Sequence, residues 1–510
     1  MKKSSIVKST AIVTVMALAT KFIGFLRDWL IVNKFGANYY TDAYKIAASI
    51  PDTIFVIIGL AISTAFLPLL SRIKVKKSTD EMHKFANNII NILLVISLVI
   101  FFTAVFFPDK IVAVLTDGKK TNPETIRIAI SLTKITLFNI LFLSINACFN
   151  ALLQVHEDFI IPSILGLFFN MPIILYLLIF KDFNVYGLTI ANVIGNALRV
   201  LVQIPSLWTH GYRYKFFIDL RDTDVHKMIM LIIPVVIGAG ANSINMVVDK
   251  KLASGVANGA VTTLDNAQLL ITFINTAVTT SITNVIYPVL ANRINEGKYK
   301  EFLELLSKTL IYLGIFLVPI SIGTAIYSEK VIRFVFGSAY NTEEAIYLAS
   351  SALLGYSLGI LFTGVRDMLN STLFSMGKTK VTAFNGVLGV IVNILLSVIL
   401  SKKIGIIGIS LASSIAMILT SLFLLISIVK LQGKLNLKSL AAKMLKILIA
   451  GGVMAAAVLF VYKKSLGFNV FLQLVFGGGT GAVIYFIAIY LLRLDEAMEV
   501  ISMVRKKINV

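Results

Sequence analysis

The chain is a series of long apolar runs separated by short polar segments that hold most of its charges. The runs do not alternate between apolar and polar residues with period two, as the strands of a membrane barrel do, and they reach the roughly 20 residues that a membrane-spanning helix needs. We predict fourteen spans, near residues 10–32, 43–70, 86–107, 127–152, 160–180, 185–208, 228–249, 262–290, 303–327, 344–370, 381–400, 404–429, 440–462 and 468–492. The pattern therefore predicts an all-α polytopic membrane protein.

Positive charges are distributed unequally between the two sides of these spans. Both ends of the chain and the loops after the second, sixth, eighth, tenth and twelfth spans are basic, and in a fourteen-span topology they all share one side. An excess of lysine and arginine marks the cytoplasmic side of a membrane protein. Both termini of this multi-pass protein are therefore predicted to be cytoplasmic.

The overall composition agrees with this topology and excludes a soluble domain. Hydrophobic residues make up 57% of the chain and charged residues 14%, with a mean hydropathy of +0.88, whereas soluble proteins carry about 25% charged residues. A net charge of +21 would suggest nucleic acid in a soluble protein, but the basic residues lie in loops between spans. We therefore expect membrane lipids, and no nucleic acid, as partners.

The chain offers little for metal or enzymatic chemistry. Its single cysteine, Cys148, excludes an intramolecular disulfide and a thiolate metal cluster. The four histidines, His83, His156, His210 and His226, lie near loops without metal-ligand spacing. No loop exceeds about 20 residues, so no extramembrane domain can host soluble chemistry. We predict no metal site and no catalytic residues.

Two pairs of segments match each other at a spacing near 220 residues. Residues 61–73 match 281–294, which places Pro68 beside Pro288, and residues 150–170 match 370–393. A shift of this size covers six spans, and since six is even, the second copy keeps the orientation of the first. Parallel repeats of this kind occur in several transporters. The repeat predicts an N-lobe at 1–220, a C-lobe at 221–432, and two extra helices with a basic tail at 433–510.

Charged residues lie inside the first span and at the ends of its neighbours. Charges within a membrane are costly and usually face a protein interior or a watery cavity, and an arginine offers a planar fork suited to phosphate. We predict a substrate-binding cavity between the lobes, lined by Arg27, Asp28, Lys45, Asp52, Lys250 and Gln268. Two alternatives stay open: Arg27 and Asp28 form a structural ion pair, or the lysines extend to the membrane surface.

Several stretches of the chain resemble one family of bacterial transporters. They are GFLRD (24–28), FGAN (35–38), TDAYKIAASIP (41–51), AISTAFLP (61–68) and NALLQVHEDFIIP (150–162), with Asn170 downstream. Together they resemble the lipid II flippase family MurJ/MviN, within the multidrug/oligosaccharidyl-lipid/polysaccharide exporter group. The resemblance implies fourteen helices and alternating access in the bacterial cytoplasmic membrane. It also implies that the last two helices line a groove for a lipid tail.

The same resemblance implies a substrate, a biological role and a set of site residues. The substrate would be lipid II, an undecaprenyl-pyrophosphate-linked peptidoglycan precursor moved to the outer leaflet, which connects the chain to cell wall biogenesis and cell shape. Arg27 and Asp28 match the family's charged pair in the first helix. The family commonly has arginines shortly after the position of Pro51, whereas Asp52 is followed by TIFV (53–56). The site is therefore expected to hold fewer fixed positive charges than the resemblance suggests.

The resemblance also bears on the driving force. Some members bind a cation, and Asp249, Asn393 and Ser397 are the nearest equivalents of its ligands. Either a coupling cation, Na⁺ or H⁺, or the membrane potential would drive the cycle, and no other cofactor is expected.

Four other functions compete with lipid II transport. The chain could export another lipid-linked polysaccharide precursor, or be a drug/cation antiporter, which is expected to have twelve spans. A membrane-embedded glycosyltransferase needs interfacial carboxylates, and the longest outer loop holds Asp109, Asp117 and Glu124 without a metal pattern. A scaffold that transports nothing would have no reason to keep charges inside its first span. The sequence therefore favours a transporter over an enzyme.

Overall fold

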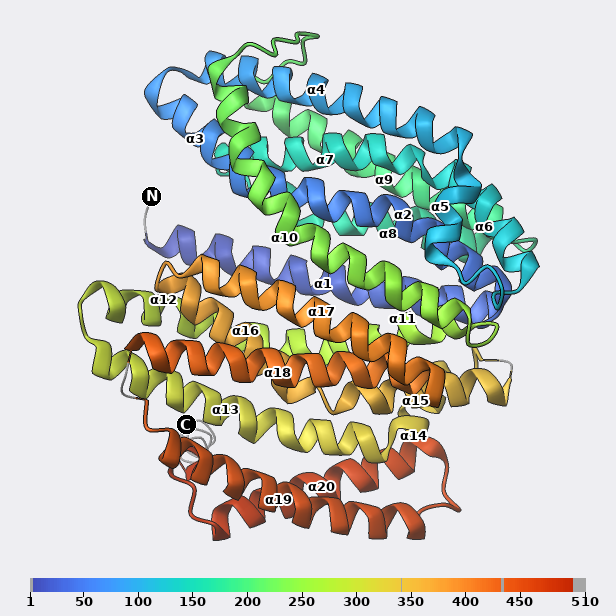
Figure 1. Ribbon diagram of the computed structural model, residues 1–510, viewed down its shortest axis with the longest axis vertical. Coiled ribbons are helices and arrows are strands. Elements are labelled where there is room, and N and C mark those ends of the chain that lie inside the picture. Colours follow the sequence, from blue (N-terminus) through green and yellow to red (C-terminus); the bar gives the residue numbers. More distant parts are fainter. Residues whose placement is uncertain (1–2, 341, 433–434, 499–510) are drawn as a thin grey trace. The chain divides into compact units, whose positions relative to one another are not determined.

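The computed structural model describes residues 3–340, 342–432 and 435–498, and throughout this part of the chain every regular element is a helix. The all-α fold class is confirmed. The chain forms two compact units, Met1–Thr262 and Thr263–Val510 (Figure 1). The lobe boundaries at 220 and 432 stay a prediction, and the basic tail after residue 498 lies outside the described residues.

Asparagine and serine side chains begin several helices of the first unit. Asn38 accepts hydrogen bonds from the backbone N–H groups of the first turn of α2, Ser78 does so for α4 and Asn184 for α9, as expected of N-caps. The elements of this unit are α1 (Lys3–Phe35), α2 (Tyr39–Ala61), the π-helical η1 (Ile62–Phe66), α3 (Leu67–Lys76), α4 (Thr79–Phe106), α5 (Pro108–Leu115), α6 (Pro123–Thr136), α7 (Phe138–Val155), α8 (Ile160–Ile179), α9 (Val185–Thr209) and α10 (Thr223–Ser254).

The second unit begins within α11 and contains the longest apolar hairpins. Gly405, with φ of 64°, makes the sharp turn between α17 and α18, which pack side by side (Figure 1). The elements are α11 (Ala260–Asn275), the π-helical η2 (Thr276–Thr280), α12 (Ser281–Asn295), α13 (Tyr299–Ile326), α14 (Ser328–Phe336), α15 (Glu343–Ser357), α16 (Ile360–Ser375), α17 (Thr379–Ile404), α18 (Ile406–Gln432), α19 (Leu437–Lys464) and α20 (Val470–Leu491).

Fewer than fourteen helices among the described residues qualify as membrane spans by length and composition. Among the described residues, eleven helical runs are long and apolar enough to cross a membrane, or twelve if the bent pair α15–α16 forms one span. The two predicted spans outside this set are α1 and α10, and both helices include residues whose side chains lie outside the described part. The predicted fourth span is broken at Leu137, between α6 and α7. The count of fourteen is therefore not confirmed.

The second span of each predicted repeat contains a π-helical segment. The run Tyr39–Lys76 is interrupted by η1, and the run Ala260–Asn295 by η2. Pro68 follows η1 closely and has no N–H to donate to residue 64, so a regular α-helical ladder cannot continue there. Both runs therefore change their hydrogen-bond pattern within the membrane-spanning length.

Helix α8 packs closely against both α1 and α9 because glycines remove side chains at the two contacts. A Cβ atom on Gly166 of α8 would lie 2.0 Å from the Thr20 side chain of α1, and one on Gly195 of α9 would lie 2.3 Å from the Phe169 carbonyl oxygen. Both distances are too short for any larger residue. These two approaches bring side chains of α1 and α9 to the middle of α8.

Candidate substrate-binding site

A three-residue charge cluster joins α1 to α2. The Arg27 guanidinium donates a hydrogen bond of 2.8 Å to one oxygen of Asp28, and the Lys45 ammonium donates one of 3.0 Å to the other. Asp28 is only 6% exposed, so its charge depends on both cations. The structure thus brings together three of the residues that the sequence predicts for the site.

Helix α8 supplies the next contacts of Arg27. Its second terminal nitrogen donates to the Asn170 side-chain oxygen at 3.0 Å, while the Asn170 amide donates back to the Gly166 carbonyl at 2.7 Å. The guanidinium carbon also lies 5.2 Å from the centroid of the Phe169 ring. The arginine is therefore held by a carboxylate, an amide and an aromatic face, which fixes its position inside the unit.

A second arginine, Arg199, reaches the same ring from α9. Its guanidinium carbon lies 4.0 Å from the Phe169 centroid, and its terminal nitrogen donates to the Asn196 side-chain oxygen at 3.2 Å. The sequence reasoning did not single out Arg199, although a charge in the middle of a predicted span is the same signal that identified Arg27. The contact with Phe169, thirty positions away in the chain, carries no local signal.

Asp52 and Lys250 add one charge of each sign to this region. Asp52 lies inside the second span, yet its side chain is exposed. Its carboxylate interacts electrostatically with Arg199, Arg27, Lys250 and Lys45. Lys250 itself is only 6% exposed. An exposed carboxylate within a span indicates a watery cavity, because lipid would not solvate the charge. Arg27, Asp28, Lys45, Asp52 and Lys250 thus all belong to one charged region of the first unit.

The remaining predicted residues have other surroundings. Gln268 is exposed on α11 in the second unit. Asn393 of α17 donates a hydrogen bond to Ser413 of α18, which joins the two helices, and it accepts one from Ser397 of α17. Asp249 accepts from Asn245 in the first unit. A role for Asp249, Asn393 and Ser397 in cation binding stays a prediction, as does a role for Gln268 in substrate binding.

Asp42 fastens the start of α2 to the loop before α11. Its carboxylate accepts hydrogen bonds from the Gly259 N–H at 2.7 Å, the Thr262 N–H at 2.8 Å and the Thr262 hydroxyl at 2.7 Å. Gly259 has φ of 83°, and a Cβ there would lie 2.5 Å from the Ala37 carbonyl oxygen. This buried carboxylate therefore has a structural role, satisfying N–H groups that begin α11.

Three of the four histidines come together at the end of α7. His83 and His156 lie 3.1 Å apart through their Nε2 atoms, and the rings of His156 and His210 stack at 4.8 Å. Burial, with Lys74 and the other two histidines nearby, lowers the pKa of His156 to about 4. No group of three or more metal-ligating residues is found within the described residues.

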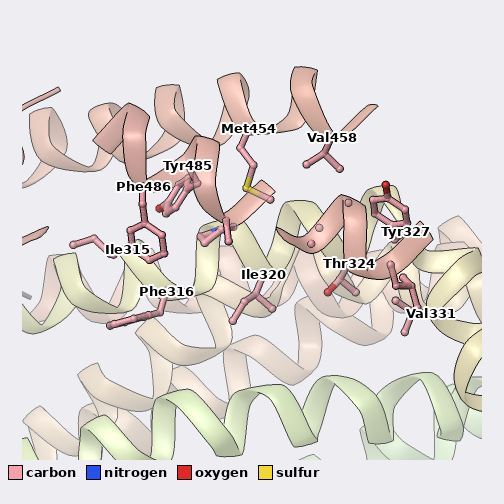
Figure 2. Close-up of a pocket in the computed structure, with 16 residues that line it drawn as sticks. Ile315, Phe316, Ile320, Thr324, Tyr327, Val331, Met454, Val458, Tyr485 and Phe486 are labelled. Carbon is pink, nitrogen blue, oxygen red and sulfur yellow. The ribbon is translucent and has the colours of Figure 1, made fainter. Parts of the chain in front are cut away.

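The second unit contains an apolar crevice between α13 and the α19–α20 pair. Its volume is about 420 Å³. Figure 2 shows Ile315, Phe316 and Ile320 of α13 on one side, with Met454 and Val458 of α19 and Tyr485 and Phe486 of α20 on the other. The crevice lining is dominated by aliphatic and aromatic side chains, so it suits a hydrocarbon chain and not a charged group.

The two regions therefore differ in the ligands that they can bind. The charged region of the first unit offers guanidinium and ammonium groups in a span, an arrangement that suits an anion such as phosphate. The crevice of the second unit offers an apolar surface. Taken separately, the first region suits a phosphorylated group and the second a hydrocarbon chain.

Comparisons with known proteins identify one matching family. The family described as "Lipid II flippase MurJ" matches residues 31–477. A probable lipid II flippase MurJ of Thermotoga maritima is 24% identical over 503 residues, covering 98% of this chain and 99% of that protein. The lipid II flippase MurJ of Thermosipho africanus is 27% identical, covering 83% of this chain and 86% of its own.

Solved structures give the same result for the fold. A lipid II flippase MurJ in an inward closed conformation matches with a TM-score of 0.81 and 26% identity, covering 94% of this chain and 98% of its own. A multidrug MATE transporter in an inward-facing conformation matches with a TM-score of 0.66 and 13% identity, covering 84% of this chain and 99% of its own. The second likeness shows a shared fold alone.

Proposed function

The chain belongs to the lipid II flippase MurJ family, and from this premise we propose that it moves lipid II from the cytoplasmic to the outer leaflet of the bacterial cytoplasmic membrane. Lipid II is the lipid-linked precursor of peptidoglycan, so the transport serves cell wall biogenesis and cell shape. The protein acts as a transporter, and no residue is assigned a catalytic step.

The observation that carries the proposal is the charge cluster buried among the spans of the first unit. Arg27, Asp28 and Lys45 are connected by contacts of 2.8 and 3.0 Å at a depth where charges are costly. Arg27 is positioned to engage the pyrophosphate of the head group. A structural ion pair needs only one cation, whereas Asp28 forms ion pairs with both Arg27 and Lys45.

The apolar crevice supports the second half of the proposal. While the head group crosses the membrane, the lipid tail of the substrate must stay in apolar surroundings. An apolar surface on the protein can hold it. The α19 and α20 helices provide such a surface against α13, lined by Met454, Val458 and Phe486. Because bilayer hydrocarbon is as apolar as these side chains, the crevice contributes van der Waals packing that positions the tail, and no hydrophobic free energy.

Transport proceeds by alternating access. Proteins that share this fold have been solved in inward-facing and outward-facing conformations, the latter with a TM-score of 0.55 to this chain. The head group enters from the cytoplasmic side, where both termini of the chain lie, and leaves on the outer side. Either a coupling cation or the membrane potential resets the cycle, since one charge crossing 100 mV contributes about 2.3 kcal/mol.

The test is complementation of bacteria depleted of their own lipid II flippase. We expect the wild-type chain to restore growth and Arg27→Ala to fail at an equal protein level. Arg72→Ala, which removes an exposed arginine of α3, is the matched control and should restore growth. Equal rescue by Arg27→Ala would exclude a pyrophosphate role for Arg27. Failure of the wild type at normal levels would contradict lipid II as the substrate and favour another lipid-linked saccharide.

A further inference from the structure

Arg199 occupies a position in α9 that an apolar residue would fill more simply. Its guanidinium lies against the Phe169 ring at 4.0 Å. Among the described residues its side chain donates one hydrogen bond, to Asn196, and its buried Nε–H has no hydrogen-bond partner there. A leucine would pack on the ring without burying an unsatisfied donor. The arginine therefore has hydrogen-bonding capacity that the protein itself does not use.

The arginine is also held in place by the backbone. Gly195, one helical turn before Arg199, touches the Phe169 carbonyl oxygen so closely that a Cβ would lie at 2.3 Å. This contact fixes α9 against α8 at the level of the ring. Arg27 reaches the same ring from α1, on the other neighbour of α8, at 5.2 Å. The two guanidinium groups thus share one aromatic side chain.

The charges around Phe169 are unbalanced. Asp28 is shared by Arg27 and Lys45, so one carboxylate serves two cations. Arg199 makes no ion pair within the part of the chain that the structure describes, and the carboxylate that interacts with it electrostatically, that of Asp52, is exposed. The region therefore carries excess positive charge beside two unpartnered N–H groups, the Nε–H of Arg27 and that of Arg199.

We propose that Arg199 is an anion-binding residue of the transport site, which together with Arg27 holds the two phosphates of a lipid diphosphate beside Phe169. This inference rests on the proposed function and adds a residue and a specificity to it. A guanidinium that stacks by its face keeps its edge N–H groups free for bidentate contacts with phosphate oxygens. Arg27 also donates to Asn170 and Asp28 but keeps further N–H groups, so the two guanidinium groups beside one ring match two linked phosphates. A lipid monophosphate can engage only one of them fully.

The experiment measures binding of two probes to the full-length protein in lipid nanodiscs. The probes are a polyprenyl diphosphate and the matching polyprenyl monophosphate, compared in wild type, Arg199→Gln, Arg199→Lys and the control Arg72→Gln. We expect the wild type and the control to prefer the diphosphate. Arg199→Gln should weaken diphosphate binding by roughly 10- to 100-fold and change monophosphate binding by less than about threefold, since one charged bidentate contact is lost.

The lysine variant separates charge from geometry. Arg199→Lys keeps the positive charge but cannot stack and donate as a planar fork, so we expect an intermediate loss of the preference for diphosphate. If Arg199→Gln does not fold, the same comparison with Arg199→Lys decides the question. Unchanged diphosphate preference in a folded Arg199 variant would overturn the proposal and leave Arg199 a packing residue.

The two proposals fail in different ways. If the wild type rescues depleted cells yet binds both probes equally, the diphosphate specificity is wrong while lipid II transport stands. If the wild type neither rescues cells nor binds either probe, the proposed function itself is wrong. A loss that affects both probes equally in Arg199→Gln also contradicts the inference, because it would indicate a general disturbance of the site.

Discussion

The charged region of the first unit and the apolar crevice of the second are formed by opposite kinds of side chain. The first places Arg27, Asp28, Lys45 and Arg199 inside spans, held by ion pairs, amides and one aromatic ring. The second is a hollow of about 420 Å³ lined mainly by carbon. The chain is 57% hydrophobic. The charged region is therefore an exception to the composition of the chain, whereas the apolar crevice is typical of it. The difference matches the two parts of an amphiphilic substrate.

The two regions also differ in what a substitution costs. Removing one partner of a buried ion pair leaves an uncompensated charge, and such losses reach roughly 3–5 kcal/mol. Filling an apolar hollow removes only the contacts that a hydrocarbon tail would make there. We therefore expect a steep response in the charged region and a graded one in the crevice.

The largest expected effect comes from Arg27→Ala. Loss of the guanidinium leaves Asp28 with Lys45 alone and removes the contact with Asn170. We expect transport of lipid II to fall roughly 100-fold or more, measured as lipid II reaching the outer face of depleted cells. Arg72→Ala should transport normally. A loss of less than about threefold in Arg27→Ala would remove the charged region from the mechanism.

The second-largest effect is expected in the crevice, where substitutions of two adjacent glycines of α20 can be compared. Gly478 lines the crevice, and a Cβ on it meets no atom within 4 Å, so Gly478→Leu should fill the hollow without a clash. We expect a roughly tenfold loss of transport, because the lipid tail loses the packing contacts that the crevice offers. The control is Gly479→Leu, which is equally open but does not line the crevice. Equal activity of the two variants would contradict a role for the crevice.

A smaller effect is expected from Asp42→Asn, which tests polar contacts that stabilise without binding substrate. The asparagine would keep one accepting oxygen and turn its NH₂ group toward the donors on the other side, the N–H of either Gly259 or Thr262. We expect the melting temperature of the purified protein to fall by about 2–4 °C. Asp182→Asn, at an exposed carboxylate, should leave it unchanged. An unaltered melting temperature in Asp42→Asn would show that these bonds contribute nothing net.

The smallest effect concerns pH and lies outside both regions. The folded protein lowers the pKa of His156 to about 4, from 6.5. Above pH 6.5 the His156 side chain is neutral in both the folded and the unfolded chain, so it does not lower the free energy of unfolding. The free energy of unfolding declines as the pH falls toward 4, because the unfolded chain takes up the proton first. His156→Asn should flatten the fall in melting temperature between pH 7 and pH 5, and an unchanged slope would contradict this reasoning.

The sequence was sufficient for the fold class and for part of the charged region. Continuous apolar runs identify membrane helices without any knowledge of packing. Arg27 and Asp28 were found because a charge inside a span is visible locally. The ends of the spans were less predictable, since a run such as 127–152 does not reveal that α6 ends at Thr136 and α7 begins at Phe138.

Arg199 shows what sequence reasoning missed and why. The family's arginines after the position of Pro51 are absent here, which predicts a site with fewer fixed positive charges than in the family. That prediction considers only the residues of α2. The structure places a guanidinium from α9 in the same region, through the close approach of Gly195 to α8. Contacts of this kind depend on which helices are neighbours, and the chain order does not specify that.

In the proposed mechanism, the charged region binds the head group of lipid II while it crosses the membrane. This mechanism is tested most directly by the amount of lipid II exposed at the outer face of depleted cells, measured by cleavage with an externally added enzyme. We predict that the wild-type chain and Arg72→Ala restore cleavage, whereas Arg27→Ala, present at an equal level, does not. Full cleavage in cells that hold only Arg27→Ala would contradict the account.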